Sequence, residues 1–98
     1  MPQEFVKDAN AVLDYEINWS TWLGTDTIAT STWTLTGESG ITIGNGANGA
    51  PAPTNTTIKA TVWLIGGVAG IGHLVTNRIV TAGGRTDERS LKIIVVQL

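Results

Sequence analysis

The 98-residue sequence contains no cysteine and only one histidine, His73. Without cysteine the chain can form neither disulfide bonds nor thiolate metal sites. A catalytic triad or an imidazole metal site would have to depend on His73 alone. We therefore predict no metal, no cofactor and no catalytic residue, and we expect an apolar core to stabilise the fold unaided.

Charge is also scarce, with 6 basic and 8 acidic side chains and a net charge of −2. This balance supplies no basic surface for phosphate backbones or anionic lipids, so we expect neither nucleic acid nor membrane as a partner. The most apolar window, 60–75, is too short to span a bilayer. Glu4, Lys7 and Asp8 interrupt the N-terminus where a signal peptide needs an apolar stretch, which predicts a cytosolic start.

Apolar and polar side chains alternate along much of the chain. In AVLDYEINW, the side chains of Leu13, Tyr15 and Ile17 share one face and the polar residues between them share the other. The same pattern predicts strands at 13–19, 27–36, 41–43, 57–64, 73–80 and 91–98. No segment is a convincing helix. About seven short strands separated by turn residues predict an all-β fold, an antiparallel β-sandwich of the immunoglobulin or fibronectin type III kind.

The length suits one domain. We assign residues 11–98 to it and treat residues 1–10 as an N-terminal extension that becomes ordered on assembly. Residues 44–56, GNGANGAPAPTNT, show no hydrophobic period and predict a flexible Gly/Pro-rich loop. The stretch TAGGRTDERS predicts a hairpin turn built on Gly83 and Gly84.

The stretch VWLIGGVAGIGHLV has the glycine spacing of a dehydrogenase nucleotide-binding loop at Gly66, Gly70 and Gly72. Such a loop requires a helix that starts at its last glycine, whereas the following HLVTNRIVT is β-branched and alternating. A P-loop fails as well, since His73 and Leu74 stand at the positions of the phosphate-binding lysine and the magnesium-binding hydroxyl. The glycines therefore predict a hairpin turn between two strands.

The titratable residues do not suggest a catalytic set. His73 falls on the apolar face of its strand, which predicts a packed and hydrogen-bonded core histidine. The pairs Asp14/Glu16 and Asp87/Glu88 fall on a wet strand face and in a hairpin with arginines. Solvated charge explains them better than a pair of glycosidase carboxylates. A calcium site at the loop aspartates stays open, although no loop motif supports it.

The four tryptophans are the most informative side chains. Trp19 and Trp33 alternate onto apolar faces and are predicted to lie in the core. Trp63 is out of phase with its apolar neighbours and Trp22 falls in a loop, so both are candidate anchors for a sugar or a protein. The last strand is apolar on both faces, which favours a protein interface. The predicted interface comprises the N-terminal segment 2–6, which includes Phe5 and Val6, together with Trp22, Trp63, Ile94, Val96 and Leu98.

Two long stretches resemble a known family. Residues 7–36 and 62–96 are similar to a family of small tailed-bacteriophage proteins in their VLDY, NWSTWLG, VWLIGG and TNRIVTAGGR segments. The resemblance implies an immunoglobulin-like fold and a virion structural role in the neck or tail, as in fiber–tail adaptors. This chain has Ala9 where the family has proline, which loosens a turn, and His73 where a tyrosine is usual.

We therefore expect a bacteriophage virion protein, an adaptor that joins fiber or other tail components by protein–protein contacts. It would assemble in the host cytoplasm and form a homo-oligomer in the particle. Three alternatives stay open. A capsid decoration protein would be present at capsid stoichiometry, a carbohydrate-binding module would hold Trp22 and Trp63 coplanar on one face, and a small enzyme would cluster titratable groups around His73.

Overall fold

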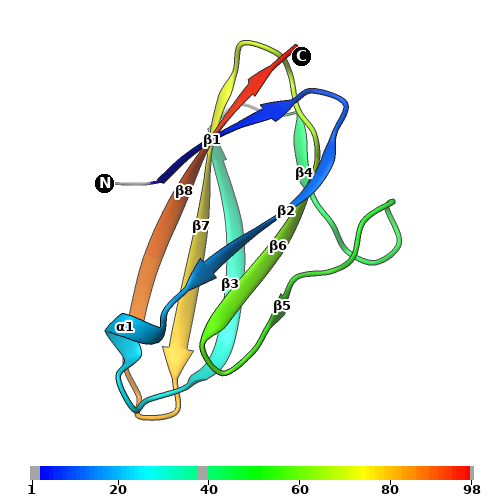
Figure 1. Ribbon diagram of the computed structural model, residues 1–98. Coiled ribbons are helices and arrows are strands. Elements are labelled where there is room, and N and C mark those ends of the chain that lie inside the picture. The colour runs from blue at the N-terminus through cyan, green and yellow to red at the C-terminus, as the bar shows by residue number, and fades with distance from the viewer. Residues whose placement is uncertain (1–2, 38–39, 98) are drawn as a thin grey trace.

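A computed structural model describes residues 3–37 and 40–97. The elements are β1 (Gln3–Asp8), β2 (Val12–Asn18), α1 (Ser20–Leu23), β3 (Ile28–Gly37), β4 (Ile41–Ile43), β5 (Thr54–Asn55), β6 (Lys59–Gly66), β7 (Gly72–Thr81) and β8 (Thr86–Val96). The first sheet has the order β1-β8-β7-β3, and the second has the order β2-β6-β4 with β5 beside β6. Figure 1 shows the two layers. The predicted β-sandwich is confirmed, and its immunoglobulin-like assignment stays a prediction.

The alternating pattern places the core between the two sheets. Every second side chain of β7 from His73 to Ile79 is buried, as the period-2 pattern predicts. Trp19 and Trp33 are buried too, which confirms their predicted place in the core. The core is formed by Tyr15, Ile17, Trp19, Leu23, Ile28, Trp33, Ile41, Ala60, Val62, Leu64, Val75, Ile79, Leu91, Ile93 and Val95.

One strand pair departs from the antiparallel expectation. β1 lies parallel to β8, in a register that runs from Gln3↔Leu91 to Asp8↔Val96. This strand falls within the predicted N-terminal extension. β8 begins at Thr86 rather than at the predicted residue 91, because the charged segment before it already pairs with β7.

The glycine-rich stretch is a strand, a turn and a strand, with no helix after Gly72. The predicted hairpin is wrong, however, because β6 belongs to the second sheet and β7 to the first. The loop 67–71 therefore crosses between the sheets. Gly67 has a φ of 122°, and a Cβ there would lie 2.7 Å from Cγ2 of Val95. A residue without a side chain is required where this loop crosses the end of β8.

Two short features lie in segments predicted as loops. α1 is a single helical turn that carries Trp22. The predicted loop 44–56 contains β5, and Asn48 Nδ2 donates a hydrogen bond of 3.1 Å to the Ile43 carbonyl. The mobility of this loop stays a prediction. Within the described residues no helix has the length and apolar character needed to cross a membrane.

Candidate interaction surfaces

Apolar side chains, of which Val6 and Leu74 are exposed and Ile94 and Val96 half-buried, gather on the outer face of the first sheet, near the end of β8. Val6 and Ile94 are paired in register across β1 and β8, and Val96 follows two residues later on the same face. The direct partner of Ile94 on β7 is Gly72, which has no side chain. The nearest β7 side chain on this face is therefore that of Leu74, diagonally across from Ile94. The side chain of Val6 is 60% exposed. We call Val6, Leu74, Ile94 and Val96 the outer patch.

Phe5 lies on the opposite side of β1 from Val6. Its ring centroid is 5.1 Å from that of Tyr15, and its half-buried side chain packs against the core. The structure therefore separates two neighbouring residues of the predicted interface and leaves Val6 on the surface. Leu98 and the residues before Gln3 lie outside the described part of the chain.

Trp63 lies on the outer face of the second sheet. It is half-buried on β6, in register with Asp14 of β2. Val12 and Ile65 form the next pair on the same face, and Val12 is exposed. Trp63, Val12 and Ile65 thus form a second apolar surface, on the side of the sandwich away from the outer patch.

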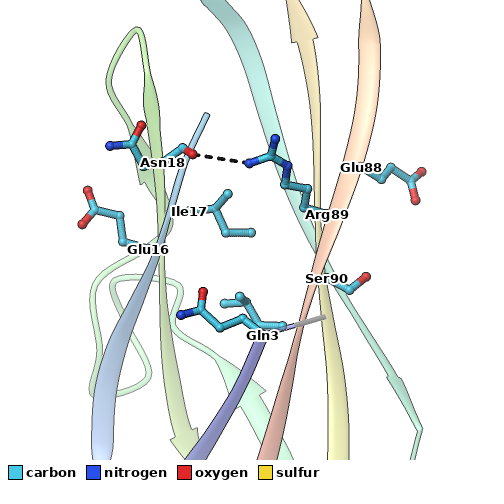
Figure 2. Close-up of a pocket in the computed structure, with 8 residues that line it drawn as sticks. Gln3, Glu16, Ile17, Asn18, Glu88, Arg89 and Ser90 are labelled. Atoms are coloured by element: carbon cyan, nitrogen blue, oxygen red, sulfur yellow. Dashed lines mark hydrogen bonds between the residues drawn. The ribbon is translucent and has the colours of Figure 1, made fainter. Parts of the chain in front are cut away.

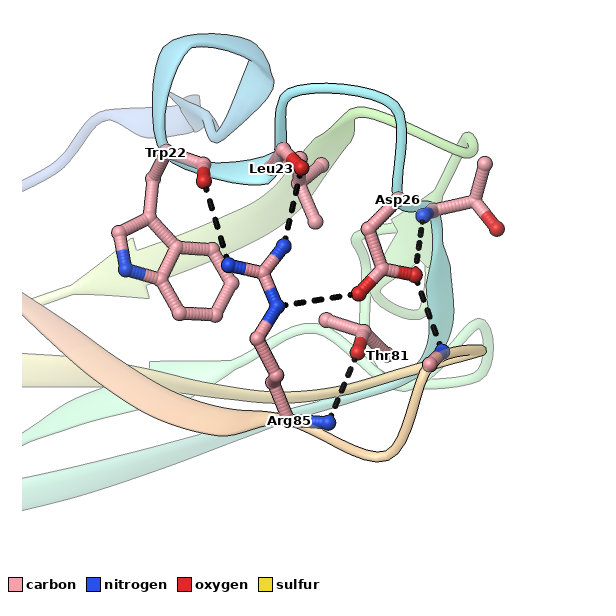
Figure 3. Close-up of polar contacts among 7 residues, drawn as sticks. Trp22, Leu23, Asp26, Thr81 and Arg85 are labelled. Carbon is pink, nitrogen blue, oxygen red and sulfur yellow. Dashed lines mark hydrogen bonds and ion pairs between the residues drawn. The ribbon is translucent and has the colours of Figure 1, made fainter.

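Trp22 is held in a polar cluster at the other end of the sandwich (Figure 3). The guanidinium carbon of Arg85 lies 4.2 Å from the centroid of the Trp22 ring. Arg85 also donates a hydrogen bond of 2.9 Å to the Leu23 carbonyl and pairs with Asp26 at 3.1 Å. The indole therefore packs under a cation–π contact and against Trp19, instead of standing free.

Asp26 is the centre of this cluster. The Thr81 hydroxyl and the main-chain N–H groups of Thr27 and Gly83 donate hydrogen bonds to its carboxylate. With the nearby Arg85 they lower the pKa of Asp26 from 3.8 to about 2. The cluster ties α1 to the turn between β7 and β8. Its hydrogen bonds link segments that are distant in sequence, so the alternation pattern gave no sign of it.

Asn77 joins the two layers inside the core. It accepts a hydrogen bond of 2.9 Å from Nε1 of Trp19 and donates one of 2.8 Å to Oγ of Ser31. It also donates to the Thr32 carbonyl at 3.2 Å. A polar residue at an inward position of an alternating strand was the only sequence signal for this role.

Lys7 is a fully buried cation that sequence reasoning also missed. Its side chain is 0% exposed and donates hydrogen bonds to the carbonyls of Asp8, Ala11 and Gly66. Burial lowers the pKa of Lys7, and the charge of Asp8 opposes this shift. The ammonium group thus fastens the end of β1 to the turn before β2 and to the end of β6.

His73 is only 1% exposed, as predicted for a core residue. The predicted hydrogen bond is not found, because within residues 3–37 and 40–97 neither ring nitrogen has a partner. The same residues contain no group of three or more His, Cys, Asp or Glu side chains that could hold a metal ion.

An open groove of about 760 Å³ runs between β2 and β8 (Figure 2). Ile17 and Leu91, both part of the core, contribute its apolar part. Its polar lining comes from Gln3, Glu16, Asn18, Glu88, Arg89 and Ser90. At one end Arg89 donates a hydrogen bond of 3.4 Å to the Asn18 carbonyl, while its guanidinium carbon lies 4.4 Å from the Trp19 ring centroid.

These features define a small β-sandwich that presents apolar surfaces on both outer faces, an arrangement typical of a protein-binding module. The model of one protein family, described as podophage GP4 fiber-tail adaptor protein gp77, matches residues 7–94. Because the match covers most of the chain, the protein belongs to this family of phage fiber-tail adaptors and is a structural component of the virion. No curated protein matches the chain.

Proposed function

We propose that this protein joins a fiber protein to another tail component, and that the outer patch forms one of the two interfaces. The observation that carries the proposal is the exposure of Val6 beside Ile94 and Val96 on a regular sheet. Exposed apolar side chains that lie together are stabilised when a partner covers them. The family match supports an adaptor role in the tail.

An adaptor needs a second surface, and we assign it to Trp63 with Val12 and Ile65. Tryptophan is frequent among the residues that contribute most to protein interfaces. The Trp63 surface lies on the second sheet and the outer patch on the first. Two partners, or a partner and a second copy of the chain, could therefore bind without contacting each other. We expect the protein to form a homo-oligomer in the particle, after assembly in the host cytoplasm.

The alternative roles find less support in the structure. A carbohydrate-binding module would need the rings of Trp22 and Trp63 on one face, whereas the ring of Trp22 is covered by Arg85. We propose a role without catalysis, because the side chain of His73 is buried and out of reach of a substrate. Copy number in purified particles separates the tail adaptor from the decoration protein, since a decoration protein would follow the stoichiometry of the capsid.

The test is a charge on the outer patch. Val6→Asp should leave folding intact, because the side chain is already 60% exposed. It should greatly reduce incorporation of the protein, and of fibers, into particles of a phage deleted for its own copy, since an interface would bury the new carboxylate. The readout is the amount of both proteins in purified particles.

The matched control is Ile58→Asp, at a residue that is 38% exposed and precedes β6 at the other end of the sandwich. Its incorporation should equal that of the wild type. Val96→Asp should behave like Val6→Asp, and its thermal unfolding shows whether the fold tolerates the charge. Normal incorporation of both patch variants would refute the assigned interface.

A further inference from the structure

We propose that β3 pairs in antiparallel orientation with β3 of a second copy of this chain, which joins the first sheets of the two copies into one continuous sheet. The inference rests on the proposed function in expecting a homo-oligomer. It goes further by naming the strand, the register and the main-chain hydrogen bonds of the contact, and it involves neither the outer patch nor the Trp63 surface.

The edge of β3 that faces away from β7 is open over most of the strand. β3 is the last strand of the first sheet, and no described strand other than β7 pairs with it (Figure 1). Within the described part of the chain, the one main-chain hydrogen bond on that side joins the Ile28 N–H to the Thr57 carbonyl at 2.8 Å, before the bulge in β3. The chain leaves this sheet after Gly37, since Ile41 already pairs with Gly66 in the second sheet. The edge beyond the bulge is therefore available to a partner strand.

The direction of the main-chain groups of β3 follows from its hydrogen bonds to the neighbouring strand. Ala82 N–H, just after β7, donates to the Thr27 carbonyl at 2.9 Å, so even-numbered residues of β7 face β3. Beyond the bulge Thr30 pairs with Val80, and even-numbered residues of β3 therefore face β7 from there on. The N–H and C=O groups that face the open edge belong to Ser31, Trp33 and Leu35.

The sequence of this part of β3 is nearly the same in both directions. Residues 30–36 are TSTWTLT, and reversing them only exchanges Ser31 and Leu35. In an antiparallel pair centred on Trp33, position 31 lies opposite position 35, and every threonine lies opposite a threonine. The residues paired through hydrogen bonds in this register are those whose main-chain groups face the open edge, so about six hydrogen bonds form.

The lack of charge on β3 favours a second copy as the partner. Among the described strands of six or more residues, β3 alone has no charged side chain. Edge strands are ordinarily protected from pairing by charge or proline, and residues 30–36 contain neither. Across a two-fold axis β3 places threonine against threonine, a cross-strand pair that stabilises a sheet, and no like charges meet.

The pairing requires no change in the core of either copy. The threonines at positions 30, 32, 34 and 36 are exposed on the outer face of the sheet, whereas Trp33 is buried in the core of its own chain. A contact made by one pair of strands is small, so we expect a weak dimer in solution. In the particle, where copies are held close together, the same contact is favoured by the high local concentration.

The first test uses hydrogen exchange on the purified wild-type protein over about a hundredfold range of concentration. As the dimer forms, exchange of the amides of Ser31, Trp33 and Leu35 should slow by about tenfold or more, because they become hydrogen-bonded. The amides of Thr32 and Thr34 already face β7 and should change less, so they serve as the internal reference. Sedimentation over the same range should show the monomer converting to a dimer.

The second test uses two double variants that differ only at position 34. Thr32→Glu with Thr34→Glu places carboxylates opposite each other on both sides of Trp33, and should weaken self-association by about tenfold or more. Thr32→Glu with Thr34→Lys is the matched control, because the same register then places each carboxylate opposite an ammonium group. Its self-association should equal or exceed that of the wild type. In both variants position 32 lies opposite Arg78 within the chain, so that contact is unchanged.

Equal self-association of the two double variants would overturn the inference. A wild type that stays monomeric at every concentration would do the same. Protection of 31–35 that appears only on adding phage particles assembled without this protein would overturn it in favour of a different partner. A monomer that still enters particles leaves the adaptor role standing, whereas a dimer that fails to enter them contradicts that role alone. If a double variant unfolds, the exchange experiment on the wild type still decides.

Discussion

At the residue scale, a few polar side chains connect elements that the apolar core alone would leave loosely joined. Asn77 links Trp19 to β3, Lys7 links the end of β1 to the end of β6, and Asp26 links α1 to the turn after β7. Each bonds to groups far away in the sequence. In a chain without cysteine, such contacts connect these elements where no covalent cross-link can.

Replacing Asp26 with asparagine should lower the melting temperature at neutral pH. The carboxylate has a folded pKa of about 2, below the unfolded value of 3.8. Its contribution to stability is therefore present above the unfolded pKa and is lost as the pH falls toward the folded one. The melting temperatures of wild type and Asp26→Asn should differ at pH 7 and converge between about pH 4 and about pH 2.

Glu88→Gln is the control for this prediction. Glu88 pairs with Arg78 at 3.0 Å, but both side chains are more than half exposed. Such a surface pair contributes little, so the substitution should change the unfolding free energy by less than about 1 kcal/mol. A difference between Asp26→Asn and wild type that persisted undiminished at pH 2 would count against the assigned role of the carboxylate.

At the scale of the elements, alternation predicted the strands that have one wet and one apolar face. β2, β3, β4, β6 and β7 were found in this way because their inward and outward side chains differ in polarity. β1 was not, since its inward residues include the cation Lys7 and its outward residues include the apolar Val6. Its polarity is inverted at these two residues. The buried Lys7 is stabilised by carbonyl partners, and two of these, Ala11 and Gly66, lie outside β1.

Sheet membership was the second thing that the sequence could not reveal. The glycines between β6 and β7 indicate that the chain turns, but a tight hairpin and a crossing between sheets use the same residue types. The choice depends on which strands supply the hydrogen-bond partners. The candidate interface showed the same limit. The sequence suggested the whole N-terminal segment 2–6 as an interface, but it could not reveal that the ring of Phe5 would pack against that of Tyr15.

Gly67→Ala tests the crossing loop. A Cβ at Gly67 would lie 2.7 Å from Cγ2 of Val95, and the φ of 122° is unfavourable for a side chain. We expect a loss of about 3 kcal/mol or more in the free energy of unfolding, from strain and from displacement of the core. Urea unfolding at neutral pH measures this loss.

Gly70→Ala separates the two causes. Gly70 has a φ of 89°, and a Cβ at this position would have no neighbouring atom within 4 Å, so only the backbone strain should remain. The expected loss is about 1 kcal/mol. Equal losses for the two variants would show that the close approach to Val95 is unimportant.

At the scale of the whole molecule, the sandwich presents different surfaces in different directions. The molecule measures 18 Å along its shortest principal axis and 31 and 42 Å along the other two. The outer patch and the Trp63 surface face opposite ways across this short dimension, while the groove between β2 and β8 opens on the edge. A small chain arranged in this way has room for more than one partner at once.

The parallel pairing of β1 with β8 also determines how the molecule responds to stretching. If Gln3 and Gln97 are pulled apart, β1 and β8 slide along each other, and all pairs from Gln3↔Leu91 to Asp8↔Val96 resist together. Cysteines introduced at these two positions provide unique attachment points, because the chain has none of its own. Single-molecule pulling should give a high rupture force.

Handles at Gly72 and Ile94 provide the comparison, since these two residues form the pair at one end of the antiparallel β7–β8 ladder. Pulling there opens that ladder one pair at a time and should require a lower force, and equal forces would contradict this account. The parallel pair β1–β8 is therefore loaded in shear, and it separates only when its hydrogen bonds break together. Tension along the chain would meet its greatest mechanical resistance at β1.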